Sequence, residues 1–171
     1  MLKDIKNLRL IAPSLFPENS WSEAEVFGAM VWLWNKNSKY KLTAIDVASE
    51  SLLAIIRSNN FALVVIDNKP IGYINWAYMN DNESNDYINN RMTYIEAVGK
   101  IEKSESKKTW VLSWFVPEST NYNKSVAKNN LLIKRIAKEV IFSEEIVYVI
   151  WHHHKKRNIV KKFKGLSVNK I

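Results

Sequence analysis

The chain has 171 residues, of which 47% are hydrophobic, and it contains seven tryptophans and no cysteine. This length is typical of one domain with its own core, and the composition excludes an intrinsically disordered protein and a disulfide scaffold. The absence of cysteine also excludes thiol chemistry and cysteine-based zinc sites. Neither a signal peptide nor an apolar run of the ~20 residues that a membrane span needs is evident. We therefore expect a cytoplasmic protein.

The formal net charge of +8 is unevenly distributed along the chain. Residues 155–171 contain seven lysines and arginines and no acidic residue, so this segment holds seven of the eight excess charges. Such a segment attracts anions. It suits an acidic protein partner, a weak contact with anionic lipid head groups, or a solvated terminus with no specific partner. Nucleic acid is disfavoured, because no nucleic-acid-binding motif accompanies the charge.

The N-terminal part of the chain divides into a lead-in and the start of a domain. Residues 1–20 contain two prolines and show little periodicity, which predicts an extended lead-in to a single domain over residues 21–171. Ser22 and Glu25 have the spacing of a capping box, in which each side chain accepts a hydrogen bond from the other residue's backbone N–H. A helix is therefore predicted from this point to about Asn35, with Val26, Met30, Leu33 and Trp34 on one face.

The middle of the chain is predicted to contain a second helix and a hairpin. Residues 35–41 are polar and predict a loop, and the apolar spacing that follows predicts a helix over roughly 43–58. Two runs rich in β-branched and aromatic residues, 61–66 and 71–79, predict strands. The residues between them, Asp67 to Pro70, are typical of a hairpin turn.

The C-terminal half is predicted to alternate between strands and helices. Residues 80–108 are rich in Asn, Ser, Glu and Lys, which indicates a mobile insertion with one short helix near 94–98. A third strand is expected over 109–116, a helix over 125–142 and a last strand over 146–151. A sheet this apolar must be covered by the helices on one or both faces.

Three blocks of sequence carry an identifying pattern. They are FGAMVWLW over residues 27–34, PIGYINWA over 70–77 and WVLSWFVP over 110–117. In this order and near this spacing, the blocks resemble the RTX-toxin-activating lysine acyltransferases, small bacterial enzymes that move a fatty acyl chain from acyl carrier protein onto lysines of a protoxin. The resemblance covers roughly residues 25–170.

The resemblance carries implications for fold, donor and acceptor. It implies an α+β fold, with the mostly antiparallel sheet and flanking helices of the GCN5-related N-acetyltransferases. It implies acyl carrier protein as the acyl donor, no bound cofactor, a protoxin or microcin-type acceptor, and a homodimer. No glycine occurs between Pro117 and Lys124. This agrees with a carrier donor, because a coenzyme A enzyme is expected to have a pyrophosphate-binding loop there.

The basic C-terminal segment gains a specific interpretation from this resemblance. Acyl carrier proteins are strongly acidic, so the segment becomes the predicted docking surface for the donor. Attraction between exposed charges is screened over about 10 Å at 0.1 M salt, and such docking would therefore weaken with ionic strength. The candidate docking residues are Lys155, Lys156, Arg157, Lys161, Lys162 and Lys164.

The chain departs from the family at both expected catalytic positions. The family's histidine lies six residues beyond the Trp-Leu-Trp triplet, where this chain has Tyr40, and its aspartate corresponds to Ser113. A lysine amine is protonated at neutral pH and needs a base, and a tyrosine is a poor base that can still donate a proton. Two hypotheses stay open: an active acyltransferase with altered groups, and a catalytically degenerate partner or scaffold in toxin or microcin maturation.

Tryptophans and histidines supply further candidates. Trp32, Trp34 and Trp76 are candidates for the wall of an acyl groove, with core packing as the alternative. In a regular strand Trp110 and Trp114 share a face and Ser113 lies on the other. The three consecutive histidines, His152, His153 and His154, allow solvated strand-end side chains, a two-ligand metal site or a relocated base. No metal site is predicted.

Overall fold

The structure is a computed structural model, and it describes residues 6–117, 124–151 and 159–166. The elements in chain order are β1 (Leu8–Ile11), α1 (Glu23–Asn35), α2 (Ile45–Arg57), β2 (Phe61–Ile66), β3 (Lys69–Met79), α3 (Asp81–Ile88), α4 (Tyr94–Val98), β4 (Lys108–Phe115), α5 (Lys124–Ile136), the π-helical turn η2 (Ala137–Ile141), β5 (Ile146–Trp151) and β6 (Ile159–Lys164).

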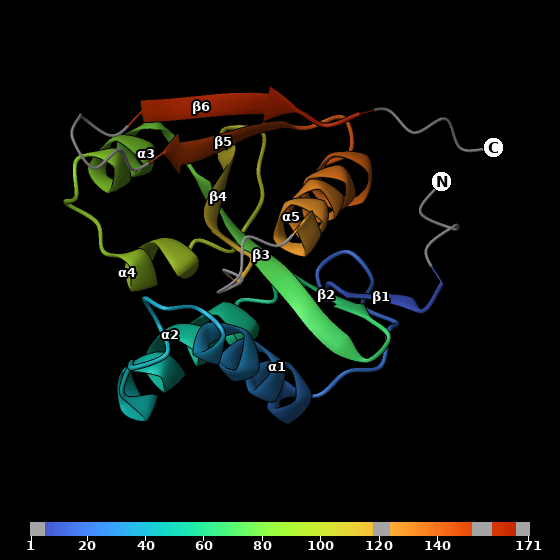
Figure 1. Ribbon diagram of the computed structural model, residues 1–171. Coiled ribbons are helices and arrows are strands. Elements are labelled where there is room, and N and C mark those ends of the chain that lie inside the picture. Colours follow the sequence, from blue (N-terminus) through green and yellow to red (C-terminus); the bar gives the residue numbers. More distant parts are fainter. Residues whose placement is uncertain (1–5, 118–123, 152–158, 167–171) are drawn as a thin grey trace.

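The strands form one six-stranded sheet in the order β1-β2-β3-β4-β5-β6. Neighbouring strands are antiparallel except for β4 and β5, which are parallel. Helices lie on both faces, with α1 and α2 on one side of β3 and α5 on the other (Figure 1). The predicted α+β fold is therefore confirmed, with a mostly antiparallel sheet and flanking helices as in the GCN5-related N-acetyltransferases.

The hairpin between β2 and β3 is tighter than predicted. Ile66 pairs with Lys69, so only Asp67 and Asn68 form the turn. Both residues have positive φ, at 49° and 60°. Two positive φ values suit the type I′ turn, whose twist matches that of the flanking strands, and Asn and Asp tolerate this conformation. Pro70 consequently belongs to β3 and not to the turn.

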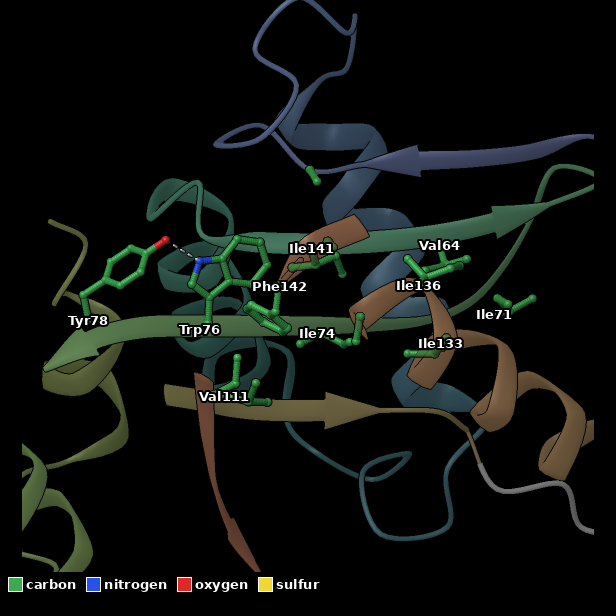
Figure 2. Packing of buried hydrophobic residues seen from close by; sticks show 14 residues of the cluster. Val64, Ile71, Ile74, Trp76, Tyr78, Val111, Ile133, Ile136, Ile141 and Phe142 are labelled. Atoms are coloured by element: carbon green, nitrogen blue, oxygen red, sulfur yellow. Dashed lines mark hydrogen bonds between the residues drawn. The ribbon is translucent and has the colours of Figure 1, made fainter. Parts of the chain in front are cut away.

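The face of the sheet covered by α5, called the α5 face here, is a buried apolar layer (Figure 2). The side chains of Ile74 and Val111 on the sheet belong to one buried cluster with Ile133 and Ile136 of α5. Trp76 lies in the same layer with 1% of its surface exposed, and its Nε1–H donates to the Tyr78 hydroxyl at 3.1 Å. Trp76, an acyl-groove candidate, is thus a core residue here.

The opposite face, called the α1 face, holds a second apolar cluster. Its members come from α1, α2 and the sheet, and they include Val26, Met30, Leu33, Leu52, Ile55, Ile56, Phe61, Leu63 and Tyr73. The three α1 residues fall at helical spacing, as the sequence predicts. Farther along this face, Met79, Ala97 and Trp110 form a smaller cluster under α3 and α4.

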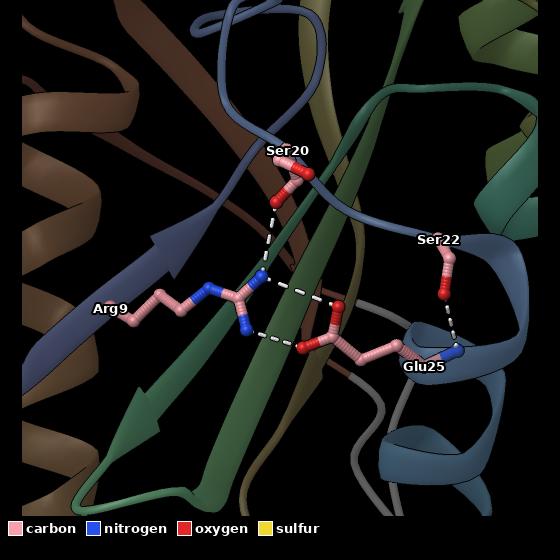
Figure 3. Close-up of polar contacts among 4 residues, drawn as sticks. All are labelled: Arg9, Ser20, Ser22 and Glu25. Carbon is pink, nitrogen blue, oxygen red and sulfur yellow. Dashed lines mark hydrogen bonds and ion pairs between the residues drawn. The ribbon is translucent and has the colours of Figure 1, made fainter.

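The start of α1 is held by half of the predicted capping box (Figure 3). The Ser22 hydroxyl accepts a hydrogen bond from the backbone N–H of Glu25 at 3.1 Å. The Glu25 carboxylate does not reach back to Ser22, because it forms an ion pair with Arg9 of β1. Arg9 also donates to the carbonyl of Ser20 at 3.0 Å. The predicted lead-in therefore contains a strand that is tied both to β2 and to α1.

The segment predicted as a mobile insertion contains two capped helices. The helix α4 confirms the prediction near residues 94–98, whereas α3 was missed. Both helices begin with a complete capping box, formed by Asn80 with Glu83 and by Thr93 with Glu96. The polar composition that suggests a mobile loop is therefore, in part, the composition of two helix starts.

The basic C-terminal segment contains an unpredicted strand. β6 pairs antiparallel with β5, with Val147 opposite Phe163 and Tyr148 opposite Lys162. Three of the candidate docking residues, Lys161, Lys162 and Lys164, lie on this strand, and all three are exposed. The other three, Lys155, Lys156 and Arg157, lie outside the described residues. The lysine-rich part of the tail is thus presented by the edge of the sheet.

Candidate functional site

A cavity of about 1240 Å³ opens where β4 and β5 part. These two parallel strands pair only from Thr109 to Val111 on β4 and from Val147 to Val149 on β5. Beyond this point β4 continues to Phe115 without β5 beside it. The cavity is lined by the following β4 residues, Leu112, Ser113, Trp114 and Phe115, and by side chains from both faces of the sheet.

A bulge in β4 decides which side chains face which part of this cavity. Asn75 of β3 pairs with Ser113, but the next residue, Trp76, pairs with Val111, so Leu112 has no partner on β3. An extra residue inverts the alternation of side chains along the strand. Trp110 therefore packs on the α1 face with Met79 and Ala97, whereas Trp114 packs on the α5 face. The prediction that Trp110 and Trp114 share a face is wrong for this reason.

The Tyr40 side of the cavity is a wall of aromatic rings. The Tyr40 ring lies 4.9 Å from the Trp34 ring and 5.6 Å from the Phe115 ring, between centroids. Tyr73 stacks on Phe115 at 5.3 Å, and its hydroxyl accepts a hydrogen bond from Trp34 Nε1 at 2.8 Å. Burial raises the pKa of Tyr73 well above its ordinary value, so this hydroxyl stays protonated.

The Ser113 side of the cavity is polar and involves a tyrosine that sequence reasoning missed. Ser113 Oγ lies 2.6 Å from the Tyr94 hydroxyl, which also donates to Asn75 Oδ1 at 3.0 Å. Burial raises the pKa of Tyr94 as well, although its bond to Ser113 acts in the opposite direction. Tyr94 stands at the first position of the predicted short helix, but no sequence pattern indicates that it reaches Ser113.

The part of the cavity near α5 and β6 is rich in lysine. Lys134 and Lys138 reach it from α5 and η2, and Lys161 and Lys162 reach it from β6. None of the described residues that line the cavity is an aspartate, a glutamate or a histidine. The three histidines, 152–154, lie outside the described residues. The described cavity thus offers tyrosine and serine hydroxyls and lysine ammonium groups.

The three tryptophans predicted for an acyl groove have separate environments. Trp34 lines the cavity, and Trp76 is buried on the α5 face. Trp32 is 42% exposed, with the Lys36 ammonium 5.2 Å from its ring centroid, and it is not among the cavity-lining residues. Tyr40, Trp34 and Ser113, which are far apart in sequence, therefore border one cavity, and Trp32 and Trp76 do not.

The sequence model of the RTX toxin acyltransferase family matches residues 19–164, which is most of the chain. This chain belongs to that family. The resemblance seen in the three sequence blocks is thereby confirmed. The assignment of Tyr40 and Ser113 to the family's catalytic positions stays a prediction.

Named relatives agree with this membership at low identity. The chain is 21% identical over 148 residues to the leukotoxin-activating lysine-acyltransferase LktC of a Pasteurella haemolytica-like species (strain 5943B). The aligned region covers 85% of this chain and 80% of that protein. It is 25% identical over 97 residues to the protein-lysine myristoyltransferase HlyC of Escherichia coli. That aligned region covers 57% of this chain and 55% of HlyC. The chain thus spans about half the length of HlyC.

The described part of the chain has neither a metal site nor a membrane-spanning helix. Residues 6–117, 124–151 and 159–166 contain no group of three His, Cys, Asp or Glu side chains placed to hold a metal ion. Among the same residues, no helix has the length and apolar character needed to cross a bilayer. The cavity between β4 and β5 is therefore the candidate functional site.

Proposed function

We propose that this protein binds an acyl chain, delivered by acyl carrier protein, in the cavity between β4 and β5 and transfers it to a lysine of a protoxin or microcin-type acceptor. The observation that carries the proposal is the meeting of Tyr40 and Ser113 at one cavity. These are the positions to which the family resemblance assigns catalysis, and Ser113 follows Tyr40 by 73 positions in the sequence.

The dimensions and lining of the cavity support an acyl donor. Ligand pockets usually occupy about 300–1,000 Å³, so a volume of about 1240 Å³ leaves room for an acyl chain together with the arm that carries it. The aromatic wall of Trp34, Tyr40 and Phe115 suits a hydrocarbon chain. The lysines of α5 and β6 suit the acidic surface of a carrier protein, because opposite charges speed and orient association.

The reaction requires one bond to form and one to break. A neutral lysine nitrogen attacks the thioester carbonyl carbon, a C–N bond forms, and the C–S bond breaks. In our proposal the Tyr40 hydroxyl donates its proton to the departing thiolate, and the tyrosinate then takes the surplus proton of the new amide nitrogen. Tyr40 is thus restored at the end of each cycle.

The proposal is tested by mass spectrometry of a candidate acceptor. The purified protein is incubated with acyl-acyl carrier protein and a protoxin or microcin-type product of its own gene cluster. The acceptor should gain the mass of one acyl group. Tyr40→Phe should lower the rate by at least about tenfold without changing the thermal midpoint. Tyr148→Phe removes a hydroxyl outside the cavity and should leave the rate unchanged. An unaltered rate in Tyr40→Phe would exclude Tyr40 from the mechanism.

Carrier docking is tested separately by charge reversal. Changing Lys155, Lys156 and Arg157 to Glu should lower the affinity for acyl carrier protein by at least about tenfold at low salt. Changing Lys161, Lys162 and Lys164 of β6 to Glu tests whether the edge strand belongs to the docking surface. If neither the substitutions nor the salt concentration changed the affinity for acyl carrier protein, the basic tail would not be the docking surface.

A second candidate function is supported by the chemistry of the cavity wall. Since Tyr40 and Ser113 replace the histidine and aspartate of the family, the chain could act as a catalytically degenerate partner or scaffold in toxin or microcin maturation. This function predicts binding to the acceptor without any acyl donor. It also predicts that Tyr40→His combined with Ser113→Asp would restore acyl transfer from a background of none.

The homodimer and the cytoplasmic location stay predictions.

A further inference from the structure

A buried amide beside the cavity has a donor without a partner. Asn75 lies in the middle of β3 with 0% of its surface exposed, and its Nδ2 has no hydrogen-bond partner among the described residues. Leaving a buried donor unpaired costs free energy, so natural proteins retain such groups for a reason. The neighbours of this amide indicate what the reason is.

Asn75, Tyr94 and Ser113 form a short line of polar groups that ends at the cavity. Asn75 and Ser113 stand directly opposite each other on β3 and β4, and the Tyr94 hydroxyl lies between them at 3.0 and 2.6 Å. Tyr94 and Ser113 line the cavity, whereas Asn75 lies behind them. The three groups therefore lead from a buried amide to a solvent-accessible hydroxyl.

The direction of the hydrogen bonds among these three groups decides whether the Ser113 hydroxyl can donate to a ligand in the cavity. When Tyr94 donates to Asn75 Oδ1, Ser113 has to donate to Tyr94, and no proton of the line points into the cavity. Turning the Asn75 amide by half a turn places Nδ2 against Tyr94. Asn75 then donates to Tyr94, Tyr94 donates to Ser113, and the Ser113 hydroxyl is free to donate to a ligand. Aligned donors of this kind also polarise one another.

In the second arrangement Oδ1 of Asn75 takes the position that has no partner, and the Ser113 hydroxyl finds an acceptor only when a ligand occupies the cavity. Burial keeps the Tyr94 hydroxyl protonated far into alkaline pH, so it remains a donor to Ser113. The three groups are uncharged in this state, which suits a neutral acceptor with a partial negative charge. In an acyl thioester that acceptor is the carbonyl oxygen, on which negative charge grows during attack by an amine.

We propose that Asn75, Tyr94 and Ser113 form a donor chain that binds the carbonyl oxygen of the acyl donor. Ser113 touches the oxygen, and Tyr94 and Asn75 are positioning residues that act through Ser113. The inference rests on the proposed function, because it requires an acyl donor in the cavity. It assigns to Ser113 a role that its family position does not provide, since a serine hydroxyl donates where an aspartate carboxylate can only accept.

The test compares two probes that differ only in the carbonyl group. One is the decanoyl thioester of N-acetylcysteamine, and the other is the S-decyl thioether, and both are titrated without an acceptor. The wild-type protein should bind the thioester about three- to tenfold more tightly than the thioether, as one hydrogen bond provides. Tyr94→Phe and Ser113→Ala should each abolish this preference and leave the affinity for the thioether unchanged.

Two comparisons distinguish a donor chain from a structural role. The double variant of Tyr94→Phe and Ser113→Ala should lose no more of the preference than either single variant, because both interrupt one chain. Tyr148→Phe removes a tyrosine hydroxyl that does not line the cavity, and it should keep the preference. Equal losses in Tyr148→Phe and Tyr94→Phe would overturn the assignment.

The outcomes separate this inference from the proposed function. If the wild type binds both probes with equal affinity, the donor chain is overturned while acyl binding in the cavity stands. If the wild type binds neither probe, the acyl-binding function itself is overturned, and the donor chain with it. A preference that survives in Tyr94→Phe but not in Ser113→Ala would overturn the role of Tyr94 and Asn75.

Discussion

On the α5 face of the sheet, Trp76 satisfies its ring N–H within the layer, through Tyr78, and its neighbours are aliphatic or aromatic. On the α1 face, by contrast, hydroxyl and amide groups lie among the apolar side chains. The described residues have three buried side-chain polar atoms without a partner, on Asn75, Ser84 and Trp110. All three lie on the α1 face or in the helix α3 packed on it. Both faces thus have a buried apolar cluster, but the unpaired polar atoms belong to the α1 side, and one of them, on Asn75, lies next to the cavity-lining residues Tyr94 and Ser113.

The first prediction concerns the contribution of the α5 face to stability. Ile136 is fully buried on this face, so Ile136→Ala should lower the free energy of unfolding by about 2–5 kcal/mol, through lost burial and the cavity left behind. Leu131, on the same helix, is 66% exposed, and Leu131→Ala should change stability by less than about 0.5 kcal/mol. Chemical denaturation measures both. Equal effects of the two substitutions would show that α5 does not seal this face.

The second prediction uses alkaline pH to probe the α1 face. Burial raises the pKa of Tyr73 and Tyr94 in the folded state. Folding therefore favours the protonated hydroxyl, and this contribution is complete below about pH 10 and is lost as the pH rises further. At about pH 11 each tyrosine should lower the free energy of unfolding by about 1.4 kcal/mol.

The control for the alkaline experiment comes from the other face. Tyr94→Phe should make stability fall less steeply above about pH 10, because one ionising group is removed from the unfolded chain. Ile136→Ala should lower the whole stability curve without changing this slope. Denaturation midpoints between about pH 8 and pH 11 measure the difference. A slope that is identical in wild type and Tyr94→Phe would contradict the burial of the Tyr94 hydroxyl.

The third prediction concerns the aromatic wall of the cavity. Trp34→Phe removes the N–H that donates to the Tyr73 hydroxyl at 2.8 Å and leaves this buried hydroxyl without its partner. The expected cost is about 1–2 kcal/mol. Trp32→Phe, two residues away on the same helix, alters an exposed ring and should cost less than about 0.5 kcal/mol. If Trp32→Phe proved the more costly change, the wall would not depend on this hydrogen bond.

The fourth and smallest prediction concerns the helices that cover the α1 face. The Lys100 ammonium, 2.7 Å from Glu83, and the backbone N–H of Asn80 lower the pKa of the Glu83 carboxyl below its ordinary value. A lowered folded-state pKa stabilises the protein above the ordinary value near 4.5 and loses this effect as the pH falls through the folded pKa.

Glu83→Ala should accordingly cost about 1 kcal/mol at neutral pH, and this difference from wild type should shrink in acid. Glu50→Ala, which removes an exposed carboxylate from α2, should cost less than about 0.5 kcal/mol. Urea denaturation at neutral pH and below about pH 4 checks the sign. A difference for Glu83→Ala that grew in acid would contradict the capping box and ion pair at α3.

Local sequence signals predicted much of this fold. The helical spacing of Val26, Met30 and Leu33 identified the buried side of α1, and Asp67-Asn68 marked the hairpin, because these features depend on residues near one another in the chain. The strand over 146–151 was also predicted within its true bounds. The strand β6 was missed, because its IVKKFK sequence has no regular apolar alternation and its pairing is provided by the backbone of β5.

The candidate site shows where such signals end. The sequence by itself determined the family and led to the prediction that Tyr40 and Ser113 stand at its catalytic positions, because motif and spacing are properties of the chain alone. Only the tertiary structure decided that Ser113 faces Asn75 and Tyr94, because this depends on the unpaired Leu112 in β4 and on where α4 packs. Register between strands and contact between distant elements are set by the packing of the whole sheet, and no local pattern encodes them.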